Sequence, residues 1–139
     1  MEFHKAYFET LFRVGSEVAR DELLEMVEKS EGNIDLLTAY ATTGETWTQE
    51  ENDEATEDLL SDLGDYLPCY GITGYSPITE HGELGFAMEM DLDKAIELGK
   101  KYLQDAIYCV RRGELFLHTC RENGPESVRV GPFVIEEIS

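Results

Sequence analysis

The feature that most constrains the fold is the order in which short apolar runs and helical stripes alternate after residue 33. The run at 34–40 (IDLLTAY) is bounded by turn formers, and residues 86–90 alternate with the period of two that is typical of a half-buried strand. Residues 55–63 and 92–103 instead repeat apolar side chains at helical spacing. Further strands are expected at 69–75, 106–110 and 115–120. The order strand, helix, strand, strand, helix, strand predicts an α+β domain with the split βαβ arrangement of a ferredoxin-like sandwich, plus an extra C-terminal hairpin.

Local signals sharpen these expectations. Thr48 and Glu51 form a capping-box pattern at the start of a helix expected over 48–66, and Asp91 is placed to cap the helix that follows it. Gly99 interrupts a helical stripe, so we expect a close packing contact there. The short connection at 111–114 predicts a hairpin, and Gly131-Pro132 places the last strand, at 128–135, on a sheet edge.

The N-terminal segment is expected to be a helical arm over residues 1–32. Phe3, Tyr7, Leu11 and Val14 recur at helical spacing, and Gly15-Ser16 then breaks the pattern. Ser16 is a good N-cap for a second helix, whose apolar stripe ends before residue 31. With a core at 34–120 and an edge strand at 128–135, residues 1–139 are predicted to form a single domain.

The net charge is the most unusual property of the composition. Thirty acidic against eleven basic residues give the 139-residue chain a formal net charge of -19. Such a surface repels nucleic acid and anionic membrane, so neither is expected as a direct partner. Solubility or adaptation to salt would also explain the charge, although salt adaptation predicts evenly spread acids and here they cluster.

Three scattered cysteines and an N-terminus without the basic start and apolar stretch of a signal peptide favour a cytoplasmic protein with reduced thiols. No pattern in the chain predicts a cofactor, and the glycines at 71, 74, 82 and 85 do not form a phosphate-binding motif.

Four short motifs carry a family resemblance: LTAY at 37–40, EN at 51–52, ELGF at 83–86 and YLQDAI at 102–107. In this order they resemble the family called domain of unknown function 3293, whose members occur in bacteria and phages, over residues 34–120. The chain departs from the family pattern at Ala41-Thr42, where an Asn-Pro pair is usual. The resemblance implies a compact α+β domain and no known activity.

The most informative segment for function is the helix expected at 48–66, which contains no lysine or arginine. Glu54, Asp58 and Asp62 are like charges one helical turn apart, which disfavours the helix. A helix selected only for stability would carry lysines at such positions. We therefore expect an anionic face that docks on a basic protein surface, formed by Glu45, Glu50, Glu51, Asp53, Glu54, Glu57, Asp58, Asp62 and Asp65.

The sharpest form of this hypothesis is a non-enzymatic protein that mimics a nucleic-acid backbone. It would inhibit or modulate a nucleic-acid-binding factor, and a phage is one expected source of such a protein. A solvated helix face is the plain alternative. A second alternative is a small ligand-binding domain or enzyme with a cleft near Tyr40, Asn52, Glu83 and Gln104, which match the family motifs.

Other chemistry has weaker support. His118 and Cys120 share a strand face, with Cys109 on the neighbouring strand and Cys69 elsewhere, but the spacing is not that of a zinc site and no metal is expected. Nothing marks a cysteine as a nucleophile with a histidine base at 81 or 118, so no catalytic residue is assigned.

Self-association is a further alternative. The basic residues Lys100, Lys101, Arg111 and Arg112 would either meet the acidic helix of a second copy or neutralise acids of their own chain. The aromatic residues at 3, 7, 8 and 12 exceed what one helix face buries, so an arm contact within a homodimer is also open.

Overall fold

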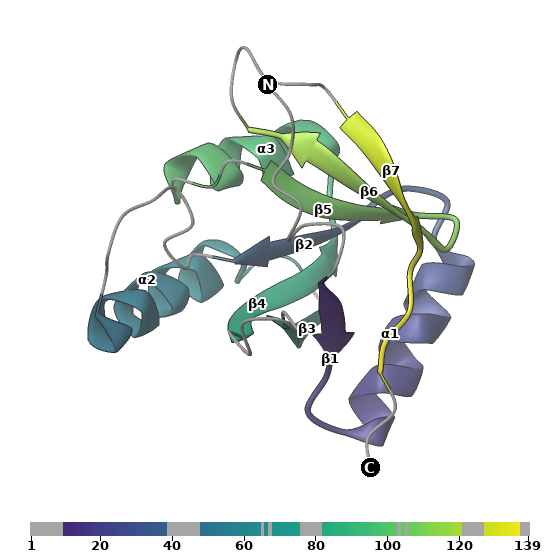
Figure 1. Cartoon of the computed structure of the whole chain (residues 1–139), viewed down its shortest axis with the longest axis horizontal. Helices are drawn as coiled ribbons and strands as arrows, with labels where there is room; N and C mark the ends of the chain where they lie inside the picture. Colours follow the sequence, from purple (N-terminus) through teal and green to yellow (C-terminus); the bar gives the residue numbers. More distant parts are fainter. Residues whose placement is uncertain are drawn as a thin grey trace.

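The computed structural model describes residues 10–38, 48–64, 66, 68–75, 82–102, 104, 106–120 and 127–136. Within them the chain is α+β, as predicted, with three helices and one antiparallel sheet of seven strands (Figure 1). The strands are β1 (Leu11–Arg13), β2 (Ile34–Thr38), β3 (Cys69–Tyr75), β4 (Gly82–Glu89), β5 (Ala106–Arg111), β6 (Glu114–Thr119) and β7 (Ser127–Pro132). The helices are α1 (Glu17–Lys29), α2 (Gln49–Asp62) and α3 (Leu92–Lys101).

The strands lie in the order β1-β3-β4-β2-β5-β6-β7. Strand β4 is therefore inserted between β2 and β3, the two strands on either side of α2 in the sequence. Strand β2 pairs with β4 and with β5, so it lies at the centre of the sheet with Ile34 at one end and Thr38 at the other.

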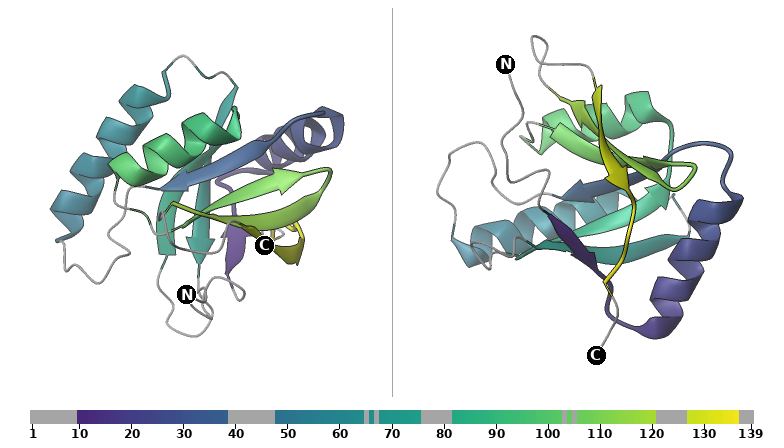
Figure 2. Two further views of the ribbon diagram at one scale, coloured as in Figure 1. Left: turned by 90° about the horizontal axis from the view of Figure 1, so that it is seen from above. Right: turned by 45° about the vertical axis from the view of Figure 1, so that its right-hand side comes forward.

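Helices cover both faces of the sheet (Figure 2). Leu59 from α2, the C-cap residue Leu63 and Leu98 from α3 pack in one buried cluster with Leu37 and Met88 from the sheet. On the other face, α1 contributes Leu23 and Val27 to a second cluster. Because β2 is covered on both faces, its burial is nearly continuous rather than alternating, which explains why its sequence is apolar except for Asp35 and Thr38.

The sheet curls until its two edges meet. The segment after β7 runs back to β1, where Ile135 forms a parallel bridge with Phe12 and the Glu136 N–H donates to the Phe12 carbonyl at 2.8 Å. The Phe12 ring packs edge-on against Tyr108, with centroids 5.2 Å apart. Phe12 thus ties the first strand to the C-terminal segment and to the centre of the sheet.

The helical prediction for the N-terminal segment is wrong at residues 11–13. Leu11 and Arg13 are exposed while Phe12 is 5% exposed, and the three residues pair with β3. The spacing of Leu11 and Val14 fits a helix, but pairing with β3 satisfies the backbone and buries Phe12. Residues 3, 7 and 8 of the predicted aromatic arm lie outside the described residues. Helix α1 begins as predicted, with the Ser16 hydroxyl accepting from the Ala19 N–H at 3.1 Å.

Most local signals are confirmed. Thr48 and Glu51 form the reciprocal capping box at the start of α2. A Cβ atom added to Gly99 would lie 2.5 Å from the Cys120 sulfur, which is the close contact expected there. Arg112 and Gly113 have positive φ values of 53° and 78°, as a two-residue hairpin turn requires. Strand β7 lies at the sheet edge, as its glycine and proline predict.

Helix α2 differs from its prediction in extent and in its buried face. It ends at Asp62 rather than at residue 66, and Leu60 is 49% exposed although the helical stripe assigned it to the core. Thr56 is buried instead, with its hydroxyl donating to the Asn52 carbonyl at 2.7 Å. Asp91 occupies the N-cap position of α3, but its side chain makes no capping hydrogen bond. None of the helices in the described part of the chain is long and apolar enough to span a membrane.

Candidate functional site

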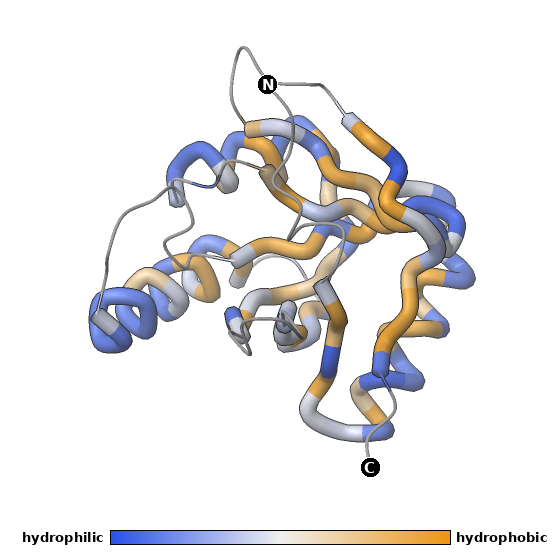
Figure 3. Tube along the Cα trace, viewed as in Figure 1, coloured by the Kyte–Doolittle hydropathy of each residue, from blue (hydrophilic) through white to orange (hydrophobic). Residues whose placement is uncertain are grey.

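The outward face of α2 carries exposed carboxylates along its whole length, and most of the helix is hydrophilic in Figure 3. Leu59 and Leu63 pack the opposite side against the sheet and α3, and Thr56 is buried as well. The exposed acids are Glu50, Glu51, Asp53, Glu54, Glu57, Asp58 and Asp62. The predicted acidic residues of this helix therefore share one solvent-facing surface, which we call the α2 acidic face; Glu45 and Asp65 lie outside the described residues.

Three members of this face have partners among the described residues. Glu51 accepts a hydrogen bond from the Thr48 N–H at 3.1 Å. Asp53 accepts a hydrogen bond from the Gln49 side chain at 2.7 Å. Asp62 accepts from Lys101 at 2.7 Å and from the Tyr102 hydroxyl at 2.6 Å, and these contacts lower the pKa of Asp62. Asp62 thus links the ends of α2 and α3. Of the two roles considered for Lys101, the structure shows neutralisation of an acid in its own chain.

The remaining carboxylates are available to solvent. In the described part of the chain, none of Glu50, Glu54, Glu57 and Asp58 forms an ion pair with a lysine or arginine. The negative charge at the centre of the face is therefore not neutralised by any described lysine or arginine.

The residues of the alternative cleft are distributed around one end of the sheet. Gly85 in β4 pairs with Thr38, the last residue of β2, so Glu83 lies two residues beyond this pair at that end. Gln104 precedes β5, which flanks β2 on its other side. Gln104 is 5% exposed and donates to the Tyr102 carbonyl at 3.0 Å, and Asn52 is half-buried on α2. Tyr40 lies outside the described residues.

Of the residues considered for metal binding, Cys109 and Cys120 are buried, whereas Cys69 and His118 are half-buried. Cys120 is buried against Gly99 of α3, and Cys109 is buried in β5 opposite Phe116. His118 pairs with Ile107, and its ring lies 6.5 Å from that of Phe116. Across the described residues, no three His, Cys, Asp or Glu side chains gather as metal ligands would.

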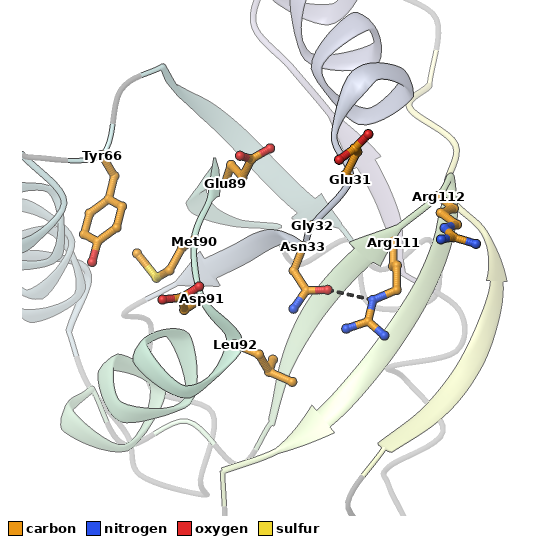
Figure 4. Close-up of a pocket in the computed structure, with 10 residues that line it drawn as sticks. All are labelled: Glu31, Gly32, Asn33, Tyr66, Glu89, Met90, Asp91, Leu92, Arg111 and Arg112. Carbon is orange, nitrogen blue, oxygen red and sulfur yellow. Dashed lines mark hydrogen bonds between the residues drawn. The ribbon is translucent and has the colours of Figure 1, made fainter.

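A cleft of about 740 Å³ opens at the other end of the sheet, where β2 begins and β4 and β5 end. Its lining comes from the α1–β2 connection (residues 31–33), the segment from β4 into α3 (residues 89–92), Tyr66, and the β5–β6 turn (residues 111 and 112). Figure 4 shows Asn33 and Arg111 side by side, with Tyr66 and Met90 on the opposite side of the cleft. Acidic, basic and apolar groups therefore meet in one open cleft.

Polar contacts fix the two walls of this cleft. The Arg111 Nε donates to the Asn33 Oδ1 at 2.9 Å, and the Asn33 carbonyl accepts from the Met90 N–H at 3.3 Å. Glu89 accepts from the Ser30 hydroxyl at 2.5 Å. These contacts join the α1–β2 connection to β4 and β5.

Asp35 lies deeper in the same region of the sheet. It faces Met88 and the Cys109 thiol on the neighbouring strands, its side chain is fully buried, and within the described chain no N–H or O–H group donates to either carboxylate oxygen. Burial raises the pKa of Asp35 to about 7, the Cys109 thiol and Arg111 offset this in part, and Asp91 adds to it. Burial and the Asp35 charge in turn raise the pKa of Cys109 to about 12. Asp35 is thus coupled to Arg111 and Asp91, two residues that line the cleft.

The comparison with protein families decides the relationship of the chain. The profile described as Protein of unknown function (DUF3293) matches residues 37–107, which is just over half of the 139 residues. The chain belongs to this family. No curated protein and no solved structure matches it.

The DUF3293 match confirms the resemblance drawn from the four motifs, over a shorter range than 34–120. It contains all of α2, and with it the α2 acidic face, as well as Asn52, Glu83 and Gln104. It contains Tyr66 and residues 89–92 of the cleft but not Asn33, Arg111 or Asp35. The cleft is therefore built partly from the DUF3293 segment and partly from sequence outside it.

Sequence reasoning missed the cleft as a site. Arg111 and Arg112 were singled out only as a basic cluster, and Asp91 only as a helix cap. The signal that could have found the region is Asp35, a single acid inside the apolar run IDLLTAY. Burying an unpaired carboxylate in a central strand lowers the stability of the fold, so its presence there indicates a role other than packing.

Proposed function

We propose that this protein is a non-enzymatic binding protein that docks on a basic protein surface through the α2 acidic face. The observation that carries the proposal is the exposed row Glu50, Glu54, Glu57 and Asp58, which forms no ion pair with the lysines and arginines that the structure describes. The opposite side of the helix holds it in place. Because the buried side and the capping box already account for the packing of α2, the acids are free to serve recognition.

The energetics of the helix support this proposal. Glu54 and Asp58 are like charges one turn apart, and each such pair costs about 0.2–0.5 kcal/mol in an isolated helix. The last turn of α2 contains no basic residue, although a positive charge there would interact favourably with the helix dipole. The helix therefore retains charges that its own stability does not require, which is expected when a partner uses them.

The concrete form of the proposal is an inhibitor or modulator that mimics a nucleic-acid backbone and occupies the basic surface of a nucleic-acid-binding protein in the cytoplasm. Regular carboxylates along a helix present a row of negative charge comparable in kind to a phosphate backbone. We propose that the scaffold that carries the α2 acidic face is one domain with a ferredoxin-like core. The strand order β3-β4-β2-β5 supports this interpretation, and so does the core cluster that α2 and α3 share.

The experiment is affinity capture with two charge-matched variants. The first replaces Glu54, Glu57 and Asp58 by lysine, which leaves the Asp62–Lys101 contact intact. The control makes the same change at Asp21, Glu22 and Glu28, three exposed acids of α1, so that both variants have the same net charge. A basic nucleic-acid-binding protein retained by the wild type and the α1 variant but lost by the α2 variant supports the proposal. Equal retention by both variants contradicts it.

A second candidate, a small ligand-binding domain or enzyme, is favoured by one observation. Glu83 and Gln104 lie at the same end of the sheet on the two sides of β2, and both belong to the DUF3293 segment. Alanine at Asn52, Glu83 and Gln104 should then remove a small-molecule interaction and leave capture of a basic protein unchanged.

A further inference from the structure

The cleft at the Ile34 end of the sheet is independent of the α2 acidic face, and its basic residues distinguish it from the rest of the surface. The other described basic residues mostly form ion pairs with carboxylates: Arg13, Arg20, Lys29, Lys94, Lys101 and Arg129. Arg111 and Arg112 form none with the carboxylates the structure describes. In a chain with thirty acids, two adjacent guanidinium groups on a cleft wall, without an ion pair to any described carboxylate, indicate a site for an external anion.

Arg111 is oriented for that task. Its Nε is held by Asn33 at 2.9 Å, which fixes the guanidinium plane and leaves the two terminal nitrogens for another acceptor (Figure 4). Two parallel N–H groups of an arginine match the two oxygens of a carboxylate.

Arg112 also lines the cleft, and its backbone adopts an unfavourable conformation. Its φ of 53° lies in the left-handed region, where asparagine or glycine would be more stable in a two-residue hairpin turn. An arginine at this position brings a second positive charge to the same wall of the cleft.

The rest of the cleft supplies negative and apolar groups. Glu31, Glu89 and Asp91 place carboxylates in the lining, and Asp91 makes no capping bond to α3 that would engage its oxygens there. A simple anion would be repelled by these acids, whereas a molecule with a separate positive group would be attracted by both walls. Tyr66, Met90 and Leu92 provide apolar surface for the body of such a molecule.

We propose that this cleft binds a small zwitterion of the amino-acid or short-peptide type. The ligand carboxylate binds Arg111 and Arg112, its ammonium group binds Glu89 and Asp91, and its apolar portion packs on Tyr66, Met90 and Leu92.

The test is an NMR titration of the uniformly labelled full chain with the dipeptide Leu-Phe, its N-acetyl form, its C-terminal amide, and free L-phenylalanine. We expect Leu-Phe to shift the amide signals of Asn33, Asp91 and Arg111, and loss of either terminal charge to weaken binding about tenfold or more, since a charge-assisted contact is lost. Tighter binding of L-phenylalanine than of Leu-Phe would assign the site to free amino acids.

Variants of the arginines test whether the dipeptide binds in the cleft. Arg111→Gln should weaken binding of Leu-Phe to the level of its C-terminal amide, whereas Arg129→Gln, a change on β7 outside the cleft, should leave binding unchanged. Arg112→Gln gives a second test if Arg111→Gln loses the dispersed spectrum of a folded protein. Equal binding of the charged and blocked peptides, shifts confined to another region, or no shift at about 10 mM ligand would overturn the proposal.

Discussion

Single side chains explain where this fold departs from a simple pattern of buried apolar and exposed polar residues. Asp35 is the clearest case, because it is fully buried in the central strand and no N–H or O–H group of the described residues donates to its carboxylate. A buried carboxyl group is less costly when it is protonated. The elevated pKa of Asp35 is therefore a consequence of its position between β4 and β5.

This position predicts a pH-dependent stability. In the folded protein burial raises the pKa of Asp35 from 3.8 to about 7, so between these values the folded state holds a proton that the unfolded state has lost. The contribution of Asp35 to the free energy of unfolding is thus fully favourable below about pH 4 and decreases as the pH rises toward 7, by up to a few kcal/mol. Urea unfolding at several pH values should show Asp35→Asn gaining stability relative to the wild type as the pH rises from about 5 to 8. A difference that stays constant over this range would contradict the assignment.

Gly99 gives a second prediction for a single residue. Alanine is normally preferred over glycine inside a helix, but its Cβ would lie 2.5 Å from the Cys120 sulfur and 3.0 Å from Ile107 Cγ2. We expect Gly99→Ala to lower the free energy of unfolding by about 1–3 kcal/mol, as overpacking does. Adding Cys120→Ala should recover part of the loss, whereas Gly32→Ala, with no atom within 4 Å of the added carbon, should have little effect. Equal stability of Gly99→Ala and the wild type in urea unfolding would refute the close contact.

At the scale of elements, local sequence signals predicted best where the physics is local. Of the three predicted N-caps, Ser16 and Thr48 form the expected hydrogen bond, whereas Asp91 occupies the N-cap position of α3 without one. A cap of this kind needs only a hydroxyl and a backbone N–H three residues away. Strand β1 was missed because three residues carry no distinctive period, and only pairing with β3 makes Phe12 a strand residue. Leu60 was likewise assigned to the core and is exposed, because the helical spacing of apolar residues does not show how much of the helix the sheet covers.

The capping box of α2 leads to a stability prediction. Thr48→Ala removes the acceptor for the Glu51 N–H, so the free energy of unfolding should fall by about 1 kcal/mol, and Thr48→Ser should retain most of it. Thermal or urea unfolding measures both variants. Identical curves for the alanine variant and the wild type would show that the cap contributes nothing.

The α2 acidic face predicts that stability and binding change in opposite directions. Asp58→Lys removes a like-charge pair and gives Glu54 an opposite charge one helical turn away, so α2 should become more stable by about 0.4–1 kcal/mol at low salt. The same change removes a carboxylate from the centre of the docking face, so affinity for a basic partner should fall. Urea unfolding and affinity measurement on the same variant check both effects. A variant that gains both stability and affinity would show that the face is only a solvated surface.

At the scale of the whole molecule, the α+β class and the order of elements from β2 onward followed from the sequence, because buried strands and amphipathic helices have different periods. The curl of the sheet did not, since the bridge between Phe12 and Ile135 joins residues from opposite ends of the chain. For the same reason the acids of α2 were predictable as one face of one helix, whereas the cleft was not. Its walls come from separate segments that only the strand register brings together.

The most direct measurement is the affinity of the captured basic partner for the wild type and the two charge-matched variants at about 0.1 M and about 0.5 M salt, between which the screening length falls by roughly half. Docking through the α2 acidic face predicts binding that weakens at least about tenfold at the higher salt, is retained by the α1 variant and is lost by the α2 variant. Affinity that is insensitive to salt, or that falls equally in both variants, would contradict it, because the net charge rather than the face would then account for binding.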